Sequence, residues 1–356
     1  MHSKSNKRSI ILDSGESALA TFPIVVSASR STDIPAFYSD WFFYRLKKGY
    51  SAWINPFNGV KSYVGYADTR FIVFWSKNPK PILSHLDTLK NLGIGCYIQY
   101  TLNDYEDERL EPGVPPIDER IDTFKRLSDK LGKDAVIWRF DPLILTDKID
   151  INRLLDKICK IGDQLQDYTK KLVFSFADID IYAKVRNNLT KAGIRYTNWT
   201  KEQMEDFAVR LISLNEEKGW KFALATCGEA SDLPGILHNH CIDDSLILRL
   251  CPDSAELISY FNAEITDPKS CLFQFSEPIP QNAISTKDGR YILIRKDNRD
   301  KGQRLACGCM KSKDIGQYNT CIHMCEYCYA NTSKQSAAQN YNRHKANPWS
   351  DTITGI

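Results

Sequence analysis

Three cysteines near the C-terminal end of the chain have a spacing that suits metal chemistry. Cys321, Cys325 and Cys328 follow the pattern C-x3-C-x2-C in the segment TCIHMCEYCYAN. Thiolates bind zinc ions and iron–sulfur clusters, and both a closed zinc site and a cubane cluster offer four coordination positions. Three thiolates on one short loop therefore leave one ligand to come from elsewhere. His323, inside the loop, or a distant cysteine could supply it for zinc, or the thiols could be free of metal.

Four further cysteines could form a second set. Cys307 and Cys309 make a C-x-C pair just upstream of the loop, and Cys227 and Cys241 lie 14 residues apart in an earlier segment. Together they could hold an auxiliary iron–sulfur cluster or a structural zinc ion that pins the C-terminal segment to the rest of the protein. Alternatively, Cys227 and Cys241 are buried apolar side chains, and the segment CGC is only a tight turn. Cys251 could take the place of Cys227 or of Cys241 in the set.

The overall composition is that of an ordinary globular protein. The 356 residues are 42% hydrophobic and 26% charged, enough for one large domain or two smaller ones. A formal charge of +3 is too small to indicate nucleic-acid binding by itself. No apolar run has the length of a membrane span, and eleven cysteines in a reducing compartment indicate metal ligands or buried thiols. We expect a cytoplasmic protein that makes no contact with membranes.

Six short apolar runs, separated by helical patterns, predict the fold. They lack clean alternation, which is typical of strands buried on both faces of a parallel sheet. They span residues 23–29, 70–77, 95–102, 135–143, 171–178 and 221–227. Without a G-x-G-x-x-G motif after the first run, the pattern favours a parallel α/β barrel of the TIM type, partial or complete. Residues 52–67 predict an inserted hairpin.

Polar residues gather where these predicted strands end, which is the end that carries the chemistry of such barrels. A turn that is merely polar would look the same. The residues we single out as cofactor or substrate ligands at these ends are Ser29, Arg30, Thr32, Asp33, Asn78, Gln99, Arg139 and Asp141. Arg139 and Asp141 could equally form an ion pair with each other, and Lys77 could be a salt-bridge partner.

The cysteine loop resembles that of the radical S-adenosylmethionine enzymes. On this resemblance Cys321, Cys325 and Cys328 hold a 4Fe–4S cluster, S-adenosylmethionine completes the open iron, and Tyr327 lies next to its adenine. Ser29, Arg30, Thr32 and Asp33 would then bind the methionine end of the cofactor. In most such enzymes the loop follows the first strand, whereas here it is near the end of the chain. Either the barrel is circularly permuted, with 23–29 as the usual second strand, or the tail folds back over the barrel mouth.

A wider resemblance covers residues 23–331. The segments SASRSTDIPAFYSDWF, NPFNG, FWSKNP, WRFDP and QRLACGCMKSKDIGQYNTCIHMCEYCYAN are similar to an uncharacterised bacterial family, a domain of unknown function with a C-terminal cysteine cluster of this kind. The two resemblances imply an enzyme that receives an electron from a flavodoxin- or ferredoxin-type donor. The enzyme would use a 5′-deoxyadenosyl radical to abstract hydrogen from a substrate, with nucleic acid and peptide both open.

The sequence also predicts how the chain is organised. We expect a polar, loosely ordered lead-in at 1–22, the barrel at 23–230, a cysteine-rich cap at 231–331 and a tail at 332–356 that contains a helix. The alternative function, of another class, is a non-catalytic iron–sulfur or zinc protein that binds nucleic acid or a protein partner.

Overall fold

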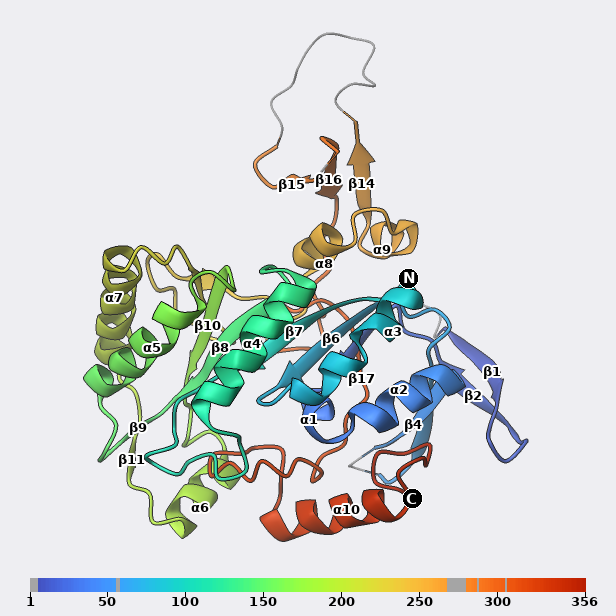
Figure 1. Ribbon diagram of the computed structural model, residues 1–356, viewed down its shortest axis with the longest axis horizontal. Helices are drawn as coiled ribbons and strands as arrows, with labels where there is room; N and C mark the ends of the chain where they lie inside the picture. Colours follow the sequence, from blue (N-terminus) through green and yellow to red (C-terminus); the bar gives the residue numbers. More distant parts are fainter. Residues whose placement is uncertain (1–5, 56–57, 268–279, 287, 305) are drawn as a thin grey trace.

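An eight-stranded parallel sheet forms the centre of the protein (Figure 1). The computed structural model describes residues 6–55, 58–267, 280–286, 288–304 and 306–356. In spatial order the strands are β17 (Lys313–Asp314), β3 (Val25–Ala28), β6 (Phe71–Ser76), β7 (Gly95–Thr101), β8 (Val136–Leu143), β10 (Lys171–Phe176), β12 (Ala223–Thr226) and β13 (Leu237–His238). All six predicted strands are present, and every neighbouring pair in this sheet is parallel.

Burial of both faces explains why the strands lack an alternating pattern. In β6, Ile72 and Phe74 belong to one hydrophobic cluster, while Phe71 and Val73 belong to a second cluster on the opposite face. Successive side chains of a strand point to opposite faces, so an apolar residue is needed at every position when both faces are covered.

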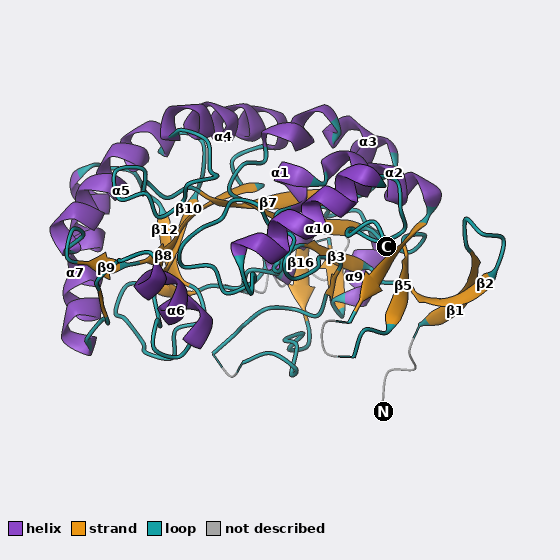
Figure 2. Cartoon of the chain, turned by 90° about the horizontal axis from the view of Figure 1, so that it is seen from below, coloured by secondary structure: helices purple, strands orange, loops and turns teal. Residues whose placement is uncertain are grey.

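Helices cover the first of these faces as an arc on the outside of the sheet (Figure 2). They are α2 (Ser39–Lys48), α3 (Leu86–Asn91), α4 (Ile117–Leu131), α5 (Ile151–Leu165) and α7 (Lys201–Glu217), with α1 (Ile34–Phe37), the 3-10 helix η1 (Lys80–Ser84) and α6 (Ala183–Lys191) beside them. Their boundaries follow local signals: Thr200 and Gln203 form a capping box at the start of α7, and Gly49 ends α2 in the left-handed conformation.

The hydrogen bonding gives an open sheet within the residues that the structure describes. Its edge strands are β13 and β17, and no pairing joins them there. Over its described residues the structure therefore shows a mixed α/β fold with a parallel sheet that does not close into a complete barrel. The two-residue strand β17 comes from the C-terminal part of the chain and pairs with β3, the first strand of the sheet in sequence.

A second sheet lies beside the first and corrects one expectation. It has the order β1 (Lys7–Ile11), β2 (Ser17–Thr21), β5 (Lys61–Gly65) and β4 (Tyr50–Ile54). The hairpin of β4 and β5 was predicted, although residues 56–57 of its turn lie outside the described part. Residues 1–22 were expected to be loosely ordered, yet β1 and β2 form a hairpin because β2 also pairs with β5.

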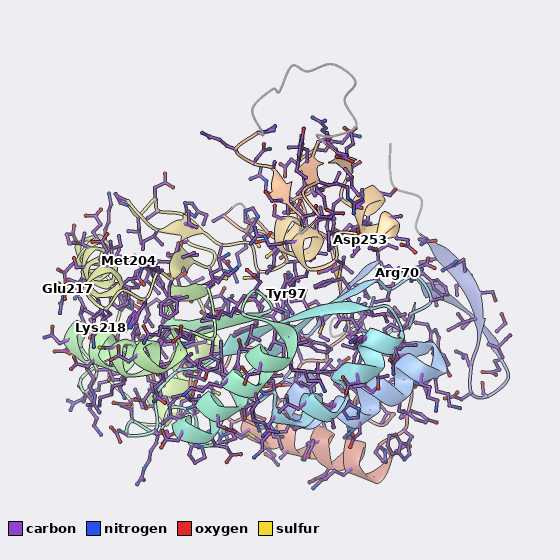
Figure 3. All side chains as sticks on the ribbon, turned by 45° about the horizontal axis from the view of Figure 1, so that its top comes forward. Arg70, Tyr97, Met204, Glu217, Lys218 and Asp253 are labelled. Atoms are coloured by element: carbon purple, nitrogen blue, oxygen red, sulfur yellow. The ribbon has the colours of Figure 1, made fainter. Side chains whose placement is uncertain are left out.

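A small unit packs against the face of the large sheet opposite the helices (Figures 1 and 3). We call this face, which carries Phe71 and Val73, the inner face. It contains α8 (Asp244–Leu250), α9 (Ala255–Tyr260), β14 (Ala263–Thr266), β15 (Ile284–Ser285) and β16 (Tyr291–Ile294). Arg70 Nε, just before β6, lies 2.9 Å from Glu256 Oε1 of α9. The Tyr97 hydroxyl of β7 donates to Cys241 O at 2.7 Å. These contacts attach the unit to the sheet.

The remaining elements are short or terminal. They are the two-stranded pair β9 (Leu145–Thr146) and β11 (Tyr196–Thr197), and the predicted C-terminal helix α10 (Lys334–Ala346). Across the described ranges, no helix is both long and apolar enough to cross a bilayer.

Candidate functional site

A cavity of about 440 Å³ lies at the carboxyl ends of the parallel strands. Residues following β3, β6, β8, β10 and β12 line it, and so does the loop with the three closely spaced cysteines. We call residues 320–331 the cluster loop. This volume is within the usual range for small-molecule sites, roughly 300–1,000 Å³.

The polar residues of β8 and β10 that line the cavity lie on the inner face of the sheet, next to the apolar residues of the same face. In β8, Ile137 belongs to the inner cluster, while Arg139 and Asp141, the next residues on that face, line the cavity. In β10, Val173 is followed in the same way by Ser175. The period of two along a strand therefore places apolar residues at one end of this face and polar residues at the other.

Asp314 attaches the C-terminal segment to the start of the sheet. Its carboxylate accepts hydrogen bonds from the Ser27 hydroxyl (2.9 Å), the Ser29 hydroxyl (2.9 Å), the Arg30 amide (2.8 Å) and the Ser31 hydroxyl (3.3 Å). These bonds explain why a two-residue strand stays in register beside β3. They also engage Ser29, a predicted cofactor ligand, in holding the segment that leads into the cluster loop.

Asp33 attaches the cluster loop itself. One carboxylate oxygen accepts from Ala36 N at the start of α1 (3.0 Å), and the other accepts from Lys77 N (2.7 Å). That second oxygen also lies 2.7 Å from His323 Nε2, and His323 Nδ1 lies 3.1 Å from Gly113 O. Both ring nitrogens of His323 thus face acceptors, so neither nitrogen is directed toward a metal ion in this arrangement.

Tyr327 lies in a buried polar network behind the cluster loop. Its hydroxyl donates to Glu111 and accepts from Lys77 Nζ (2.9 Å) and Asn103 Nδ2 (3.1 Å). Burial opposes the charge of Glu111, but Lys77 and Arg120 outweigh it and hold the pKa of this carboxyl below its usual value. Burial raises the pKa of the Tyr327 hydroxyl well above its usual range, and the Glu111 charge adds to this. The tyrosine is therefore a neutral group that fixes the loop to the strand ends.

The three cluster-loop thiols all line the cavity. Burial raises the pKa of Cys321 and Cys325, so as bare thiols these two stay protonated at neutral pH. Across the described residues, no group of three or more histidine, cysteine, aspartate or glutamate side chains is placed to hold a metal ion. A single zinc ion needs every sulfur within about 2.3 Å of one point, whereas a cubane places a separate iron at each sulfur and takes wider spacing.

Two predicted ligands have polar atoms without partners at the cavity. Arg30 Nη2 and Thr32 Oγ1 are buried and make no hydrogen bond within the described part of the chain. Both residues line the cavity. Buried polar groups are nearly always paired, so these two atoms indicate a place where a polar ligand fits.

Other predicted ligands are engaged or lie elsewhere. Arg139 and Asp141 form the ion pair that was the alternative interpretation, with Arg139 Nε 3.1 Å from the carboxylate. Gln99 binds Arg139 Nη1 through Oε1 at 3.1 Å and Cys241 O through Nε2 at 2.9 Å. Gln99 and Asn78 are not among the residues that line the cavity. Their assignment as cofactor ligands stays a prediction, and the observed role of Gln99 is to orient Arg139.

The second set of cysteines lines the same cavity. Cys227, Cys241, Cys307 and Cys309 all contribute, although they come from segments up to about 80 residues apart. The sulfur atoms of Cys227 and Cys241 lie 3.2 Å apart and are not bonded. The Cys309 thiol, as a hydrogen-bond donor, lowers the pKa of Cys307 to about 6.

Several residues of the site carried no signal in the sequence. Asp314, Glu111 and Arg120 matter because of partners more than 100 residues away or in another element. Glu229 also lines the cavity, and burial raises its pKa to about 7. The signal that could have found Glu229 is its position two residues after Cys227 at the end of a strand.

Fold and site together define a class: a parallel α/β protein whose strand ends surround a cavity lined by seven cysteine thiols. The family model described as Domain of unknown function (DUF1848) matches residues 25–330, so the chain belongs to this family. Comparisons with curated proteins and with solved structures found no match.

Proposed function

We propose that this protein is a radical S-adenosylmethionine enzyme in which Cys321, Cys325 and Cys328 hold a 4Fe–4S cluster. The observation that carries the proposal is the position of the cluster loop. Three thiols with the C-x3-C-x2-C spacing line a cavity at the carboxyl ends of a parallel sheet, the end where α/β enzymes bind ligands.

The place of the cluster loop in the sheet supports a circular permutation. Asp314 of β17 pairs with Ser27 of β3, and the cluster loop follows β17 after a few residues. The order of elements in space is then strand, cysteine loop, next strand, as in enzymes that carry the loop after their first strand. In this interpretation β17 takes the place of that first strand and β3 takes the place of the second.

The donor set fits a cluster with one open iron better than a closed zinc site. The only histidine inside the cluster loop, His323, has both ring nitrogens engaged by Asp33 and Gly113. The loop therefore offers three sulfurs, while its histidine is held by Asp33 and Gly113 and its carboxylate, Glu326, pairs with Lys334. Three thiolates leave a position for the amino and carboxylate groups of the cofactor.

The chain's own residues have defined tasks in such an enzyme. Arg30 Nη2 and Thr32 Oγ1, the unpartnered buried atoms, are the groups we assign to the polar end of the cofactor. Asp33 and Lys77 hold the loop against the strand ends, and the buried network behind Tyr327 keeps water from reaching the thiols from that side. When bound, cluster and cofactor supply a 5′-deoxyadenosyl radical and methionine after one electron arrives from a flavodoxin- or ferredoxin-type donor.

A reconstitution experiment tests the proposal. The full chain, loaded with iron and sulfide without oxygen, should release 5′-deoxyadenosine when dithionite and S-adenosylmethionine are added. A chain with Cys321, Cys325 and Cys328 all changed to alanine should release none, while Cys159→Ala, a thiol on α5, serves as the matched control. Protein that binds zinc in the loop, or that holds a cluster without releasing the nucleoside, would support the non-catalytic alternative instead.

A further inference from the structure

Four thiols outside the cluster loop converge on one region of the cavity. Cys227 follows β12, Cys241 lies two residues before the N-cap of α8, and Cys307 and Cys309 belong to the segment that leads to β17. All four line the cavity, and all four are free thiols. In sequence they form two pairs more than 60 residues apart, so the fold has brought them together.

The surroundings of Cys241 are those of a sulfur that accepts hydrogen bonds. Arg139 Nη1 and Asn239 Nδ2 each donate to Cys241 Sγ at 3.2 Å. Cys241 is 3% exposed and Arg139 is 2% exposed, so both groups are shielded from water. Two N–H donors, one of them from a cation, point at Cys241 Sγ, which suits a sulfur that accepts hydrogen bonds as a metal ligand does rather than a thiol packed as an apolar side chain.

A second cation lies on the other side of the set. The Arg30 guanidinium interacts electrostatically with Cys309, Cys241 and Cys307, and its Nη2 is the buried atom without a partner. The Arg30 and Arg139 guanidinium groups lie 5.5 and 5.4 Å from the centre of the Trp75 ring. Four thiolates around a zinc ion, or around a cubane core of charge +2, carry a net charge of about −2, which Arg30 and Arg139 offset in part because Arg139 also pairs with Asp141.

The backbone between Cys307 and Cys309 is shaped to bring them close. A Cβ atom on Gly308 would lie 2.2 Å from Cδ2 of His240, so only glycine lets this turn pack against the segment of Cys241. Asp300 N donates to Cys309 O at 2.9 Å, and Met310 N donates to Ile242 O at 2.9 Å. The C-x-C turn is thus fixed beside Cys241 by backbone contacts on both sides.

We propose that Cys227, Cys241, Cys307 and Cys309 form a second metal centre, a four-thiolate site distinct from the cluster loop. In the described side-chain arrangement no three of them are yet placed around one ion, so binding requires their side chains to rotate toward a common point while the backbone of the C-x-C turn stays in place. A disulfide between Cys227 and Cys241 would explain neither the C-x-C turn nor the two N–H donors. The metal is a zinc ion or an iron–sulfur core, since both take four thiolates, and its role is to pin the segment before β17 to the sheet.

Metal analysis of the full chain, prepared without oxygen, tests this proposal separately from the proposed function. In the variant with Cys321, Cys325 and Cys328 changed to alanine, the second centre should retain its metal. The expected content is either about one zinc ion or at least two irons with matching sulfide per chain. Adding Cys227→Ser and Cys241→Ser should reduce this content to background, whereas adding Cys159→Ser should leave it unchanged. A metal-free cluster-loop variant that is still folded would overturn the proposal.

If a variant does not fold, alkylation of the natural chain provides a second test, because it measures whether the four thiols are protected by a bound metal. Cys227, Cys241, Cys307 and Cys309 should resist iodoacetamide in the loaded protein and react at least tenfold faster after chelation of the metal, as mass spectrometry of the peptides would show. Cys159 should react equally in both states. Equal reactivity of the four thiols before and after chelation, or recovery of a Cys227–Cys241 disulfide from oxygen-free protein, would contradict a metal centre here.

Discussion

Asp33 Oδ2 lies 2.7 Å from His323 Nε2 and thereby joins the end of β3 to the cluster loop. The two residues are 290 positions apart in the chain, and both are buried. The same carboxylate caps α1 and accepts from Lys77 N. One side chain therefore fixes the first strand end, the second strand end and the cysteine loop relative to one another, so the geometry of the site depends on this carboxylate.

Replacement of Asp33 should disrupt the site. Asp33→Ala removes a helix cap and a charge-assisted hydrogen bond to His323, and we expect the free energy of unfolding to fall by about 2–4 kcal/mol. Denaturant unfolding measures this change. Asp40→Ala is the matched control because Asp40 pairs with His85 at the surface, and it should change stability by less than about 1 kcal/mol. Similar losses for the two variants would contradict the role of Asp33.

Replacement of His323 tests whether this histidine only holds the loop in place or is a ligand of a metal ion. Because both ring nitrogens are engaged, His323→Ala should lower the thermal midpoint while the iron content per reconstituted chain stays near that of the natural protein. If His323 instead completed a zinc site, the variant would lose its metal. Iron and zinc analysis beside a thermal scan distinguishes the two outcomes, with His85→Ala, a partly exposed histidine outside the cavity, as the control for metal content.

Glu111 should make stability depend on pH in a defined direction. Its pKa in the folded protein is held below the ordinary value of 4.5, so its contribution is present above about pH 4.5 and is lost as the pH falls through the folded-state pKa. Glu111→Gln leaves Lys77 and Arg120 without their buried partner and should cost about 3 kcal/mol at pH 7. The difference between natural protein and variant should shrink in acid. A difference that grows toward pH 3 would refute this assignment.

The control for Glu111 is a carboxylate in an exposed pair. Glu119 Oε1 lies 2.7 Å from Lys80 Nζ at the surface, so Glu119→Gln should change stability by no more than about 1 kcal/mol at either pH. Urea unfolding of both variants and the natural protein at the same set of pH values makes the comparison.

Replacement of Gly113 tests whether the backbone at Gly113 must lie close to the backbone of the cluster loop. A Cβ atom there would lie 2.7 Å from the carbonyl oxygens of Ile322 and His323, and Gly113 N donates to His323 O at 2.9 Å. Gly113→Ala should push the loop away, lowering both thermal stability and iron content. Gly302→Ala is the control, since an added Cβ would meet only Asp300 Oδ1, at 3.3 Å. Full iron content in Gly113→Ala would show that the approach is not required.

The parts of the fold that the sequence predicted are those with local signals. Residues 71–75 and 135–138 are apolar at every position, so each run could be recognised as part of a strand covered on both faces. The cysteine spacing likewise lies within eight residues. By contrast, β17 has two residues and no periodicity, and its place beside β3 depends on Asp314 binding serines almost 290 positions earlier. Contacts between residues so far apart in the chain leave no recognisable pattern in a single sequence.

The interpretation of individual site residues was limited for the same reason. Asp33 and Ser29 were correctly placed at a strand end, but the sequence could not show that their oxygens already bind His323 and Asp314. Gln99 was assigned to a ligand, which stays a prediction, but the sequence could not show that it hydrogen-bonds to Arg139 where alternate residues of β7 and β8 meet on one face. Pairing of polar groups across strands is decided by register, which local patterns do not fix.

The most direct test of the central claim is the magnetic resonance spectrum of the reduced, reconstituted protein with isotopically labelled S-adenosylmethionine. If one iron of the cluster at Cys321, Cys325 and Cys328 is open, nitrogen-15 and oxygen-17 in the amino and carboxylate groups should show hyperfine coupling to the cluster. The coupling should disappear in the triple alanine variant. A cluster spectrum that is identical with and without the labelled cofactor would contradict the proposed enzyme.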